Sequence, residues 1–144
     1  AAVYEDCNGR IPMGAMGASF GAYHAVNTVL KHPDIFSHGF GLSGVYDISH
    51  YFGDSFDDNC YQNSPVHYLP NLVGTDRWAE VNKVNLTLIC GQGAWERVHW
   101  TTDFSSFLNS LGFQHTLDLW GHDVAHDWPW WYKQMNLYLR KYFG

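Results

Sequence analysis

The sequence predicts an α/β protein in which helices cover both faces of a mostly parallel sheet, a three-layer α/β/α arrangement. Strand-like apolar runs alternate with helix-like segments, in the order strand, helix, strand, irregular excursion, strand, helix, strand, helix. This alternation is typical of βαβ units, whose connections place neighbouring strands in parallel. The length of 144 residues, with 46% apolar and 15% charged residues, predicts a single compact domain over residues 1–144.

The first strand and helix are predicted on either side of residue 19. A short apolar run over residues 10–16 predicts a buried strand. In the helix predicted from residue 20 to His32, apolar residues recur at helical spacing. The helix ends there because the residue before Pro33 is biased away from the helical conformation.

The remaining elements follow from similar signals. Residues 36–44 predict a second buried strand, and residues 51–80 predict an irregular excursion with short helical turns that forms a small lid. Two further strands and a helix are predicted over residues 86–90, 115–120 and 98–111. The last helix begins near Asp127, a favourable N-cap, with Pro129 in its first turn.

Residues 17–21, G-A-S-F-G, match the G-x-S-x-G pattern of a nucleophile elbow, a sharp strand-to-helix turn that exposes a serine hydroxyl. Glycine is expected two residues before and two residues after the serine, at positions 17 and 21, because so tight a turn leaves little room for a Cβ. The pattern predicts Ser19 as a nucleophile and the backbone N–H of Phe20 as a donor to an oxyanion hole. An inert serine in a glycine-rich turn is the alternative.

A serine nucleophile needs a base that accepts its proton. Three histidines lie late in the chain, and His115 begins a predicted strand, so we interpret it as structural or exposed. His122 and His126 both lie in the loop after the last strand. We favour His126 because it directly precedes the last helix, and a surface or capping histidine is the alternative.

The base in turn needs a carboxylate that orients it, and in α/β-hydrolases this acid lies between the serine and the histidine in the chain. Glu96 is the only carboxylate in residues 91–96, directly after the third predicted strand. Asp123, close to His126 in sequence, is the second choice, and Asp47, near the end of the second strand, is the third. An exposed Glu96 that stabilises a helix N-terminus is the alternative.

The spacing of His122 and His126 also fits H-x-x-x-H, with Asp123 between them. A zinc protease motif needs both histidines on one helical face and a glutamate as base, whereas here the acid is an aspartate and Gly121 and Pro129 flank the stretch. No third ligand is evident, so we expect no metal and no cofactor.

The chain is rich in aromatic residues, at 17%, with seven tryptophans. Trp95, Trp128 and Trp130 lie beside the candidate acid and base, and we predict that they line an apolar pocket for the acyl or alcohol group of a substrate. Core or surface aromatics are the alternative.

Composition excludes several partners and favours one compartment. The formal charge of −6, without a basic cluster, argues against nucleic acid, and no apolar run approaches the length of a membrane span. Three cysteines, Cys7, Cys60 and Cys90, give no disulfide framework and predict a reducing, cytoplasmic compartment. Cys90 lies in an apolar run and is predicted to be a buried, inert thiol.

Residues 16–25, 42–47 and 120–129 resemble the esterase branch of the α/β-hydrolase superfamily, and His-Asp-Trp at 126–128, followed by aromatics, is the most specific match. The resemblance implies a serine esterase that hydrolyses small-molecule carboxylic esters, with Ser19 as nucleophile and His126 as base. The family usually carries an Asp or Glu soon after the strand that ends at Gly91, where here only Glu96 can serve.

The chain departs from that family because strands and helices before the elbow are almost absent, so the fold is expected to be a truncated α/β-hydrolase-like fold without the usual second oxyanion donor. The elbow strand then becomes an edge, which is a template for pairing. We therefore expect a homo-oligomer, most simply a two-fold dimer, in which elements near residues 1–16 of two copies meet. A non-catalytic hydrolase-like binding module and an inactive fragment of a longer esterase are the alternatives.

Overall fold

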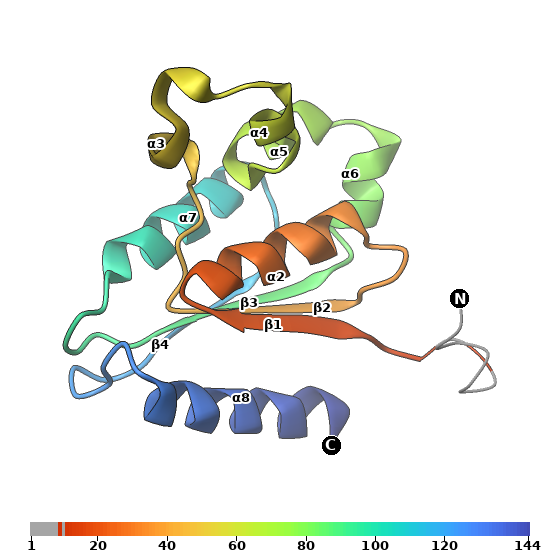
Figure 1. The fold of residues 1–144 in the computed structure, drawn as a ribbon. Coiled ribbons are helices and arrows are strands. Elements are labelled where there is room, and N and C mark those ends of the chain that lie inside the picture. The colour runs from red at the N-terminus through yellow and green to blue at the C-terminus, as the bar shows by residue number, and fades with distance from the viewer. Residues whose placement is uncertain (1–8, 10) are drawn as a thin grey trace.

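The computed structural model describes residues 9 and 11–144. Four strands form one sheet in the order β1-β2-β3-β4, and every neighbouring pair is parallel. The strands are β1 (Gly14–Ala18), β2 (His38–Leu42), β3 (Asn85–Cys90) and β4 (Thr116–Leu119). Helices α2 (Phe20–Lys31) and α7 (Val98–Ser110) cover one face, and α8 (Trp128–Phe143) covers the other (Figure 1). The predicted three-layer fold is confirmed, and the described sheet is entirely parallel.

Parallel pairing places the carboxyl ends of all four strands at one edge of the sheet. Ala18, the last residue of β1, pairs with Leu42, and Leu42 also pairs with Ile89 of β3. Ser19 and Ser43 therefore leave two neighbouring strands at the same level. The loops after β3 and β4 begin at this edge too, so residues far apart in sequence meet there.

The segment between β2 and β3 consists mainly of short helices on the same side of the sheet as α2 and α7 (Figure 1). They are α3 (Ser49–Phe52), the 3₁₀ helix η1 (Gly53–Ser55), α4 (Asp58–Gln62), α5 (Pro65–Leu72) and α6 (Asp76–Val81). The short helical turns predicted for residues 51–80 are thus present. A role of this segment as a lid stays a prediction.

Two apolar cores lie on the two faces of the sheet. One joins the sheet to α2, α7 and the short helices, and it includes Val26, Leu88 and Phe104. The other joins the sheet to α8 through residues such as Ile89 and Trp131. Because Leu88 and Ile89 enter opposite cores, β3 is buried on both faces from Leu86 to Cys90, which explains why Thr87 is its one polar residue in that range.

Element boundaries shift by a few residues from the sequence prediction. The first strand runs over Gly14–Ala18 instead of residues 10–16, because pairing with β2 continues until the turn at Ser19. Helix α8 begins at Trp128 as expected, and the Asp127 carboxylate accepts the backbone N–H of Trp128 at 2.7 Å. In the described residues, no helix is both long and apolar enough to cross a bilayer.

Candidate active site

Ser19 lies in a strained turn between β1 and α2. Its φ of 56° and ψ of −122° are values that residues with a Cβ rarely adopt. The backbone N–H of Ser19 donates to the carbonyl of Leu42 at 2.8 Å, and its own carbonyl accepts the N–H of Ala22 at 3.1 Å. The neighbouring strand and the first turn of the helix together hold the serine in this conformation.

The two glycines of the motif differ in how much space surrounds the Cα atom. A Cβ on Gly17 would lie 2.1 Å from the carbonyl oxygen of Gly21, so no other residue fits there without a backbone shift. A Cβ on Gly21 would meet nothing within 4 Å, and the expectation of restricted space at this position is therefore wrong. The close approach is made by the backbone carbonyl of Gly21, not by its Cα substituent.

Three predicted side chains from three different loops come together beyond the sheet edge. The Ser19 Oγ lies 3.1 Å from the His126 Nε2, and the His126 Nδ1 lies 3.1 Å from the Glu96 Oε2. The Glu96 side chain is 1% exposed and that of His126 is 26% exposed. Such an arrangement can pass a proton from a hydroxyl to an imidazole whose other nitrogen faces a carboxylate.

The surroundings of Glu96 satisfy both of its carboxylate oxygens. Ser43 Oγ donates to Glu96 Oε1 at 2.6 Å, and the Cys90 thiol lies 3.5 Å from Glu96 Oε2. Burial, together with the nearby Glu96 carboxylate, raises the pKa of the Cys90 thiol to about 12. Cys90 is buried as predicted, and it stays a neutral thiol that contacts the acid.

Ser43 and Trp131 contact the site, although no sequence pattern assigned either a role. Ser43 is 5% exposed with a φ of 49°, and its Oγ accepts the indole N–H of Trp131 at 3.0 Å. The Trp131 ring also meets the His126 ring edge-on, with centroids 4.8 Å apart. Two signals in the sequence could have pointed to Ser43: it directly follows a predicted buried strand, as Ser19 does, and it lies in residues 42–47, one of the stretches that carry the family resemblance.

The other candidate bases and acids lie elsewhere. His115 is held by the Ser105 Oγ at 2.6 Å and the Phe113 carbonyl at 2.9 Å. The Asp47 carboxylate accepts hydrogen bonds from the backbone N–H and the hydroxyl of Ser49. Burial raises the pKa of Asp47, but these hydrogen bonds and the nearby histidines lower it by more. The pKa of Asp47 is therefore lowered overall.

The H-x-x-x-H stretch does not assemble a metal-binding cluster. Both His122 and Asp123 are exposed, whereas His126 faces Ser19 and Glu96. Within residues 9 and 11–144, no group of three or more His, Cys, Asp or Glu side chains is placed to hold a metal ion.

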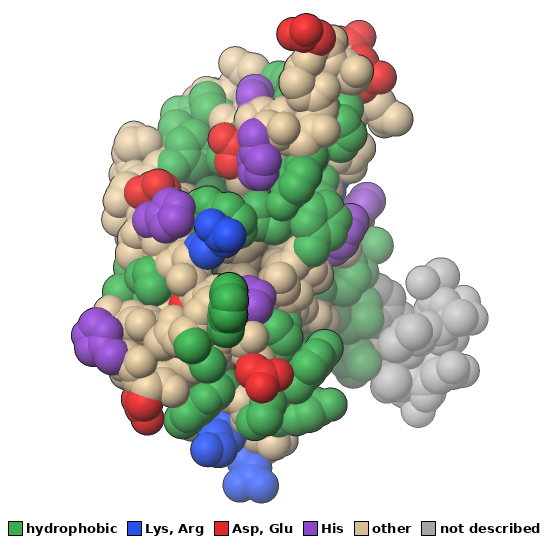
Figure 2. All heavy atoms as spheres, turned by 60° about the vertical axis from the view of Figure 1, so that its left-hand side comes forward, with side chains coloured by type: hydrophobic (Ala, Val, Ile, Leu, Met, Phe, Trp, Pro, Cys, Tyr) green, Lys and Arg blue, Asp and Glu red, His purple; other side chains and the backbone are tan. Residues whose placement is uncertain are grey.

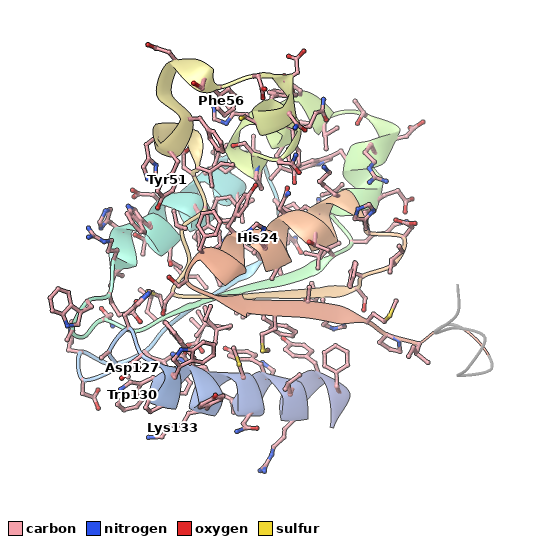
Figure 3. The ribbon with its side chains drawn as sticks, viewed as in Figure 1. His24, Tyr51, Phe56, Asp127, Trp130 and Lys133 are labelled. Carbon is pink, nitrogen blue, oxygen red and sulfur yellow. The ribbon has the colours of Figure 1, made fainter. Side chains whose placement is uncertain are left out.

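The backbone N–H predicted as an oxyanion donor lies directly after Ser19. Phe20 is the first residue of α2, so helix geometry gives its N–H no acceptor within the helix. The Phe20 ring packs against His24, with centroids 5.0 Å apart, and against Tyr51 of α3, at 6.1 Å. Tyr51 therefore lies over the beginning of α2 (Figure 3).

The three tryptophans predicted to bind substrate do not share one pocket. Trp95 has a φ of 65° and is 88% exposed, and Trp128, 52% exposed, packs its ring on Trp131 at 5.1 Å. Trp130 lies at the start of α8 beside Lys133, whose ammonium is 4.3 Å from the ring centroid (Figure 3). Their role in binding stays a prediction.

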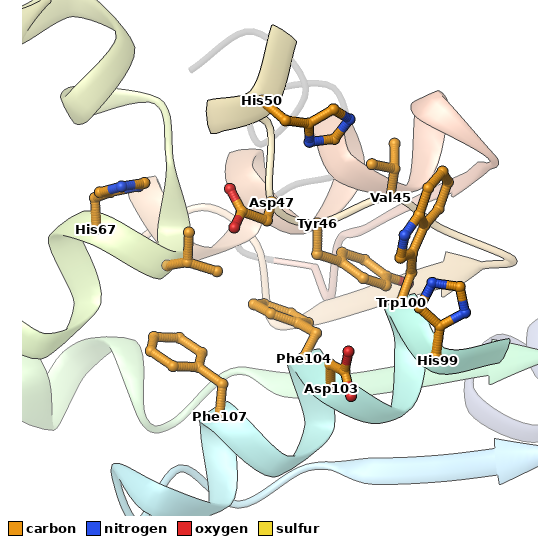
Figure 4. Close-up of a pocket in the computed structure, with 11 residues that line it drawn as sticks. Val45, Tyr46, Asp47, His50, His67, His99, Trp100, Asp103, Phe104 and Phe107 are labelled. Carbon is orange, nitrogen blue, oxygen red and sulfur yellow. The ribbon is translucent and has the colours of Figure 1, made fainter. Parts of the chain in front are cut away.

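A cavity of about 560 Å³ lies between the loop after β2, helix α5 and helix α7 (Figure 4). Its walls combine aromatic rings with three histidines and two aspartates, and the stacked rings of Tyr46 and Phe104 form part of them. Trp95, Trp128 and Trp130 are not among its lining residues. Figure 2 shows the side of the molecule where the strands end, on which histidine and hydrophobic side chains are interspersed.

Several solved structures of similar fold are described as esterases or hydrolases. No protein-family model and no curated protein sequence matches the chain. A ferulic acid esterase is 22% identical with a TM-score of 0.68, and the similarity covers 88% of this chain and 49% of that one. The S-formylglutathione hydrolase FrmB from Staphylococcus aureus is 20% identical, with a TM-score of 0.67 and coverages of 88% and 49%.

A third similar structure is FphF, a fluorophosphonate-binding serine hydrolase from Staphylococcus aureus, which is 18% identical with a TM-score of 0.70. The similarity covers 97% of this chain and 60% of FphF. The chain thus spans about half to three fifths of the length of these proteins. At these identities the likeness establishes the α/β-hydrolase fold.

Proposed function

We propose, on the premise of this α/β-hydrolase fold, that the chain is a serine esterase that hydrolyses small-molecule carboxylic esters. The observation that carries the proposal is the continuous contact from the Ser19 hydroxyl through His126 to the buried Glu96 carboxylate. Ser19 is the nucleophile of the elbow, His126 is the general base and Glu96 orients it. The hydrolases of similar fold support the same reaction class.

The reaction proceeds in two halves through an acyl-enzyme. The Ser19 Oγ attacks the ester carbonyl carbon while its proton passes to the His126 Nε2, and the carbonyl electron pair moves onto oxygen. When the carbonyl re-forms, the bond to the alcohol oxygen breaks, and the departing alcohol takes the proton from His126. Water then attacks the acyl group with His126 as base again, and collapse releases the carboxylic acid and returns the proton to Ser19.

The negative oxygen of each tetrahedral intermediate needs hydrogen-bond donors. The Phe20 N–H at the start of α2 supplies one, and the positive end of the helix dipole adds to it. One such donor typically contributes about 10²- to 10³-fold in rate.

Substrate binding is assigned by the same proposal to Trp95 and Trp128, whose rings are exposed and which lie next to Glu96 and two residues after His126 in the chain. Trp130 is included as well, with its ring against Lys133. No cofactor takes part in this mechanism. The free thiols of Cys60 and Cys90 support a reducing, cytoplasmic compartment, whereas Cys7 lies outside the described residues.

The proposal is tested by turnover of p-nitrophenyl acetate. Wild-type chain should release p-nitrophenolate and Ser19→Ala should not, with matching circular dichroism spectra. Ser37→Ala is the matched control, because Ser37 Oγ also lies within hydrogen-bond distance of a histidine, 2.8 Å from His38 Nδ1. Turnover at the uncatalysed rate in both wild type and Ser19→Ala would favour the non-catalytic binding module or the inactive fragment, and equal catalysed turnover in both would exclude Ser19 as the nucleophile.

Self-association is the second part of the proposal. In the described part of the chain, β1 has a neighbouring strand on one side only. An apolar groove runs beside it, and Met16, Phe40, Leu139 and Phe143 contribute to its lining. A second copy that docks on β1 would cover this edge; residues 1–8 and 10, which the prediction also includes, lie outside the described residues.

Light scattering over a dilution series measures this directly. A dimer whose dissociation follows concentration supports the proposal, and Met16→Lys should shift it to monomer because it places a charge in the groove. Tyr132→Lys, on the exposed surface of α8, is the control and should leave the dimer intact. A folded, active monomer at every concentration would contradict this part alone.

A further inference from the structure

The hydrogen bonds that lead from Trp131 to Glu96 can run in only one direction. An indole N–H donates and never accepts, so the 3.0 Å contact makes the Ser43 Oγ an acceptor from Trp131. The hydroxyl proton of Ser43 is then directed to Glu96 Oε1, 2.6 Å away. The orientation of the Ser43 hydroxyl is thus fixed by its two neighbours.

This direction continues through the acid to the imidazole. Glu96 Oε1 is occupied by the Ser43 hydroxyl, and Glu96 Oε2 faces the His126 Nδ1 at 3.1 Å. A carboxylate that only accepts requires the proton of a neutral imidazole to lie on Nδ1. The His126 Nε2 then presents its lone pair to the Ser19 Oγ, which is the tautomer that a general base needs.

We propose that Ser43 and Trp131 are positioning residues, which hold the Glu96 carboxylate in one orientation and thereby set the tautomer of His126. The inference rests on the proposed function and extends it to a strand end and a helix that carry no member of the triad. Neither residue touches the reacting atoms, so both act through Glu96 and His126.

The backbone of Ser43 supports this assignment. Its φ of 49° lies in the left-handed region, where glycine is relaxed and serine is strained. The N–H of Ser43 donates to the carbonyl of Ile89 at 2.7 Å, which holds that conformation. A serine at a position that favours glycine, with its hydroxyl fully engaged, indicates that the hydroxyl is what the position requires.

Trp131 supports the site in two ways from one ring. Its N–H orients Ser43, and its edge-on contact of 4.8 Å with the His126 ring limits rotation of the imidazole. The Trp131 ring is buried in the core between α8 and the sheet. The packing of α8 is thereby coupled to the geometry of the base.

The test measures kcat and KM for p-nitrophenyl acetate in Ser43→Ala and Ser43→Gly. Both should lower kcat by about 10- to 100-fold with KM little changed, since each removes one hydrogen bond to a buried carboxylate. Ser43→Gly also relieves the backbone strain, so agreement between the two variants assigns the loss to the hydroxyl. Ser105→Ala, which removes another buried hydroxyl that bonds a histidine, is the control and should keep full activity.

Trp131→Phe keeps a ring beside His126 but removes the indole N–H together with part of the buried bicyclic ring. It should lower kcat by about 3- to 10-fold, less than Ser43→Ala, because the Ser43 hydroxyl keeps its acceptor but loses its fixed orientation. Trp120→Phe is the matched control, since it removes an indole N–H that donates instead to Asp118 at 2.9 Å.

A double-mutant cycle separates positioning from general structural support. In a Glu96→Ala background, Ser43→Ala should lower kcat by less than about twofold, because the group that it orients is absent. The low-field proton resonance of the His126 Nδ1–H provides a readout without turnover. It should be present in wild type and Ser105→Ala, and lost or moved upfield in Ser43→Ala.

Two results would overturn the positioning role while Ser19→Ala is inactive: unchanged kcat and an unchanged resonance in Ser43→Ala, or an equal loss with and without Glu96. Activity of Ser19→Ala equal to wild type would instead overturn the proposed function, and this inference with it. The two failures are therefore distinguishable.

Discussion

Two serine–histidine pairs at opposite ends of the sheet show what distinguishes a candidate nucleophile from an ordinary hydrogen bond. Ser37 Oγ lies 2.8 Å from His38 Nδ1, closer than Ser19 Oγ lies to His126 Nε2 at 3.1 Å. The Ser37 hydroxyl also bonds the carbonyl of Met13 at 3.2 Å. Ser37 and His38 are sequence neighbours at the beginning of β2, whereas 107 residues separate Ser19 from His126.

The difference lies in what surrounds each pair. His126 has a buried carboxylate on its second nitrogen, and Ser19 stands in a strained turn followed by a helix N-terminus. The His38 ring instead packs against Tyr142 and Phe143 of α8, and burial lowers the pKa of His38. Distance between a hydroxyl and an imidazole is therefore a poor criterion, and the second partner of the imidazole is a better one.

The largest effect is expected at the base. His126→Ala should lower kcat by about 10⁵- to 10⁶-fold, as removal of Ser19 would, because members of a catalytic triad act as a unit. His38→Ala and His122→Ala, measured in the same assay, should keep most of the activity. An inactive His122→Ala beside an active His126→Ala would show that the base is misassigned.

The next effect concerns the buried carboxylate beside His126. Glu96→Gln should lower kcat by about 10⁴-fold, less than loss of the serine, because an amide can donate to Nδ1 and favours the wrong tautomer. Asp123→Asn and Asp47→Asn serve as comparisons in steady-state kinetics. A wild-type rate for Glu96→Gln with a strong loss in either aspartate variant would transfer the acid role.

The turn that carries Ser19 gives a third effect, on folding. Gly17→Ala should destabilise the chain by about 3 kcal/mol, because its Cβ would lie 2.1 Å from a backbone oxygen. Gly21→Ala meets nothing within 4 Å and should change the free energy of unfolding far less. Urea denaturation of both variants measures the difference, and equal destabilisation would contradict the geometry of the turn.

The smallest effect is the pH dependence of stability that His38 contributes. Because the pKa of His38 is lowered in the folded chain, the unfolded chain takes up the His38 proton at a higher pH, near 6.5, as the pH falls. Stability should therefore decrease as pH falls below this value, and His38→Gln should weaken that dependence. Thermal melts between about pH 5 and 8 test it; an unchanged slope in His38→Gln would show that His38 does not contribute.

Local signals in the sequence were sufficient for the fold. Apolar runs predicted three strands, alternation of apolar and polar residues predicted the fourth, and the cap residue Asp127 predicted the beginning of α8. The boundary of β1 was displaced because strand pairing, which a single sequence does not display, extends it to Ala18. The restricted space expected at Gly21 was wrong because a pattern does not tell which of two atoms makes a close approach.

The candidate site was predictable where chain order restricts the choice. The loops after successive parallel strands meet at one edge, so chain position favoured Glu96 and His126, while His122, Asp123 and Asp47 stayed as alternatives. The roles of Ser43 and Trp131 could not be predicted from the sequence, since their contacts depend on side-chain direction and on how α8 packs against the sheet. For the tryptophans near the site, sequence gives proximity to the loops but not which way each ring points.

Of the Ser19 and Ser37 hydroxyls, we expect only that of Ser19 to be activated by its surroundings. Incubation with an alkyl fluorophosphonate, followed by intact-mass and peptide mass spectrometry, measures this activation, because an activated serine attacks phosphorus and expels fluoride. We expect a single adduct on the peptide that contains Ser19, which Ser37→Ala retains and His126→Ala loses. An adduct on Ser37, or an unmodified Ser19 in a chain that hydrolyses esters, would contradict it.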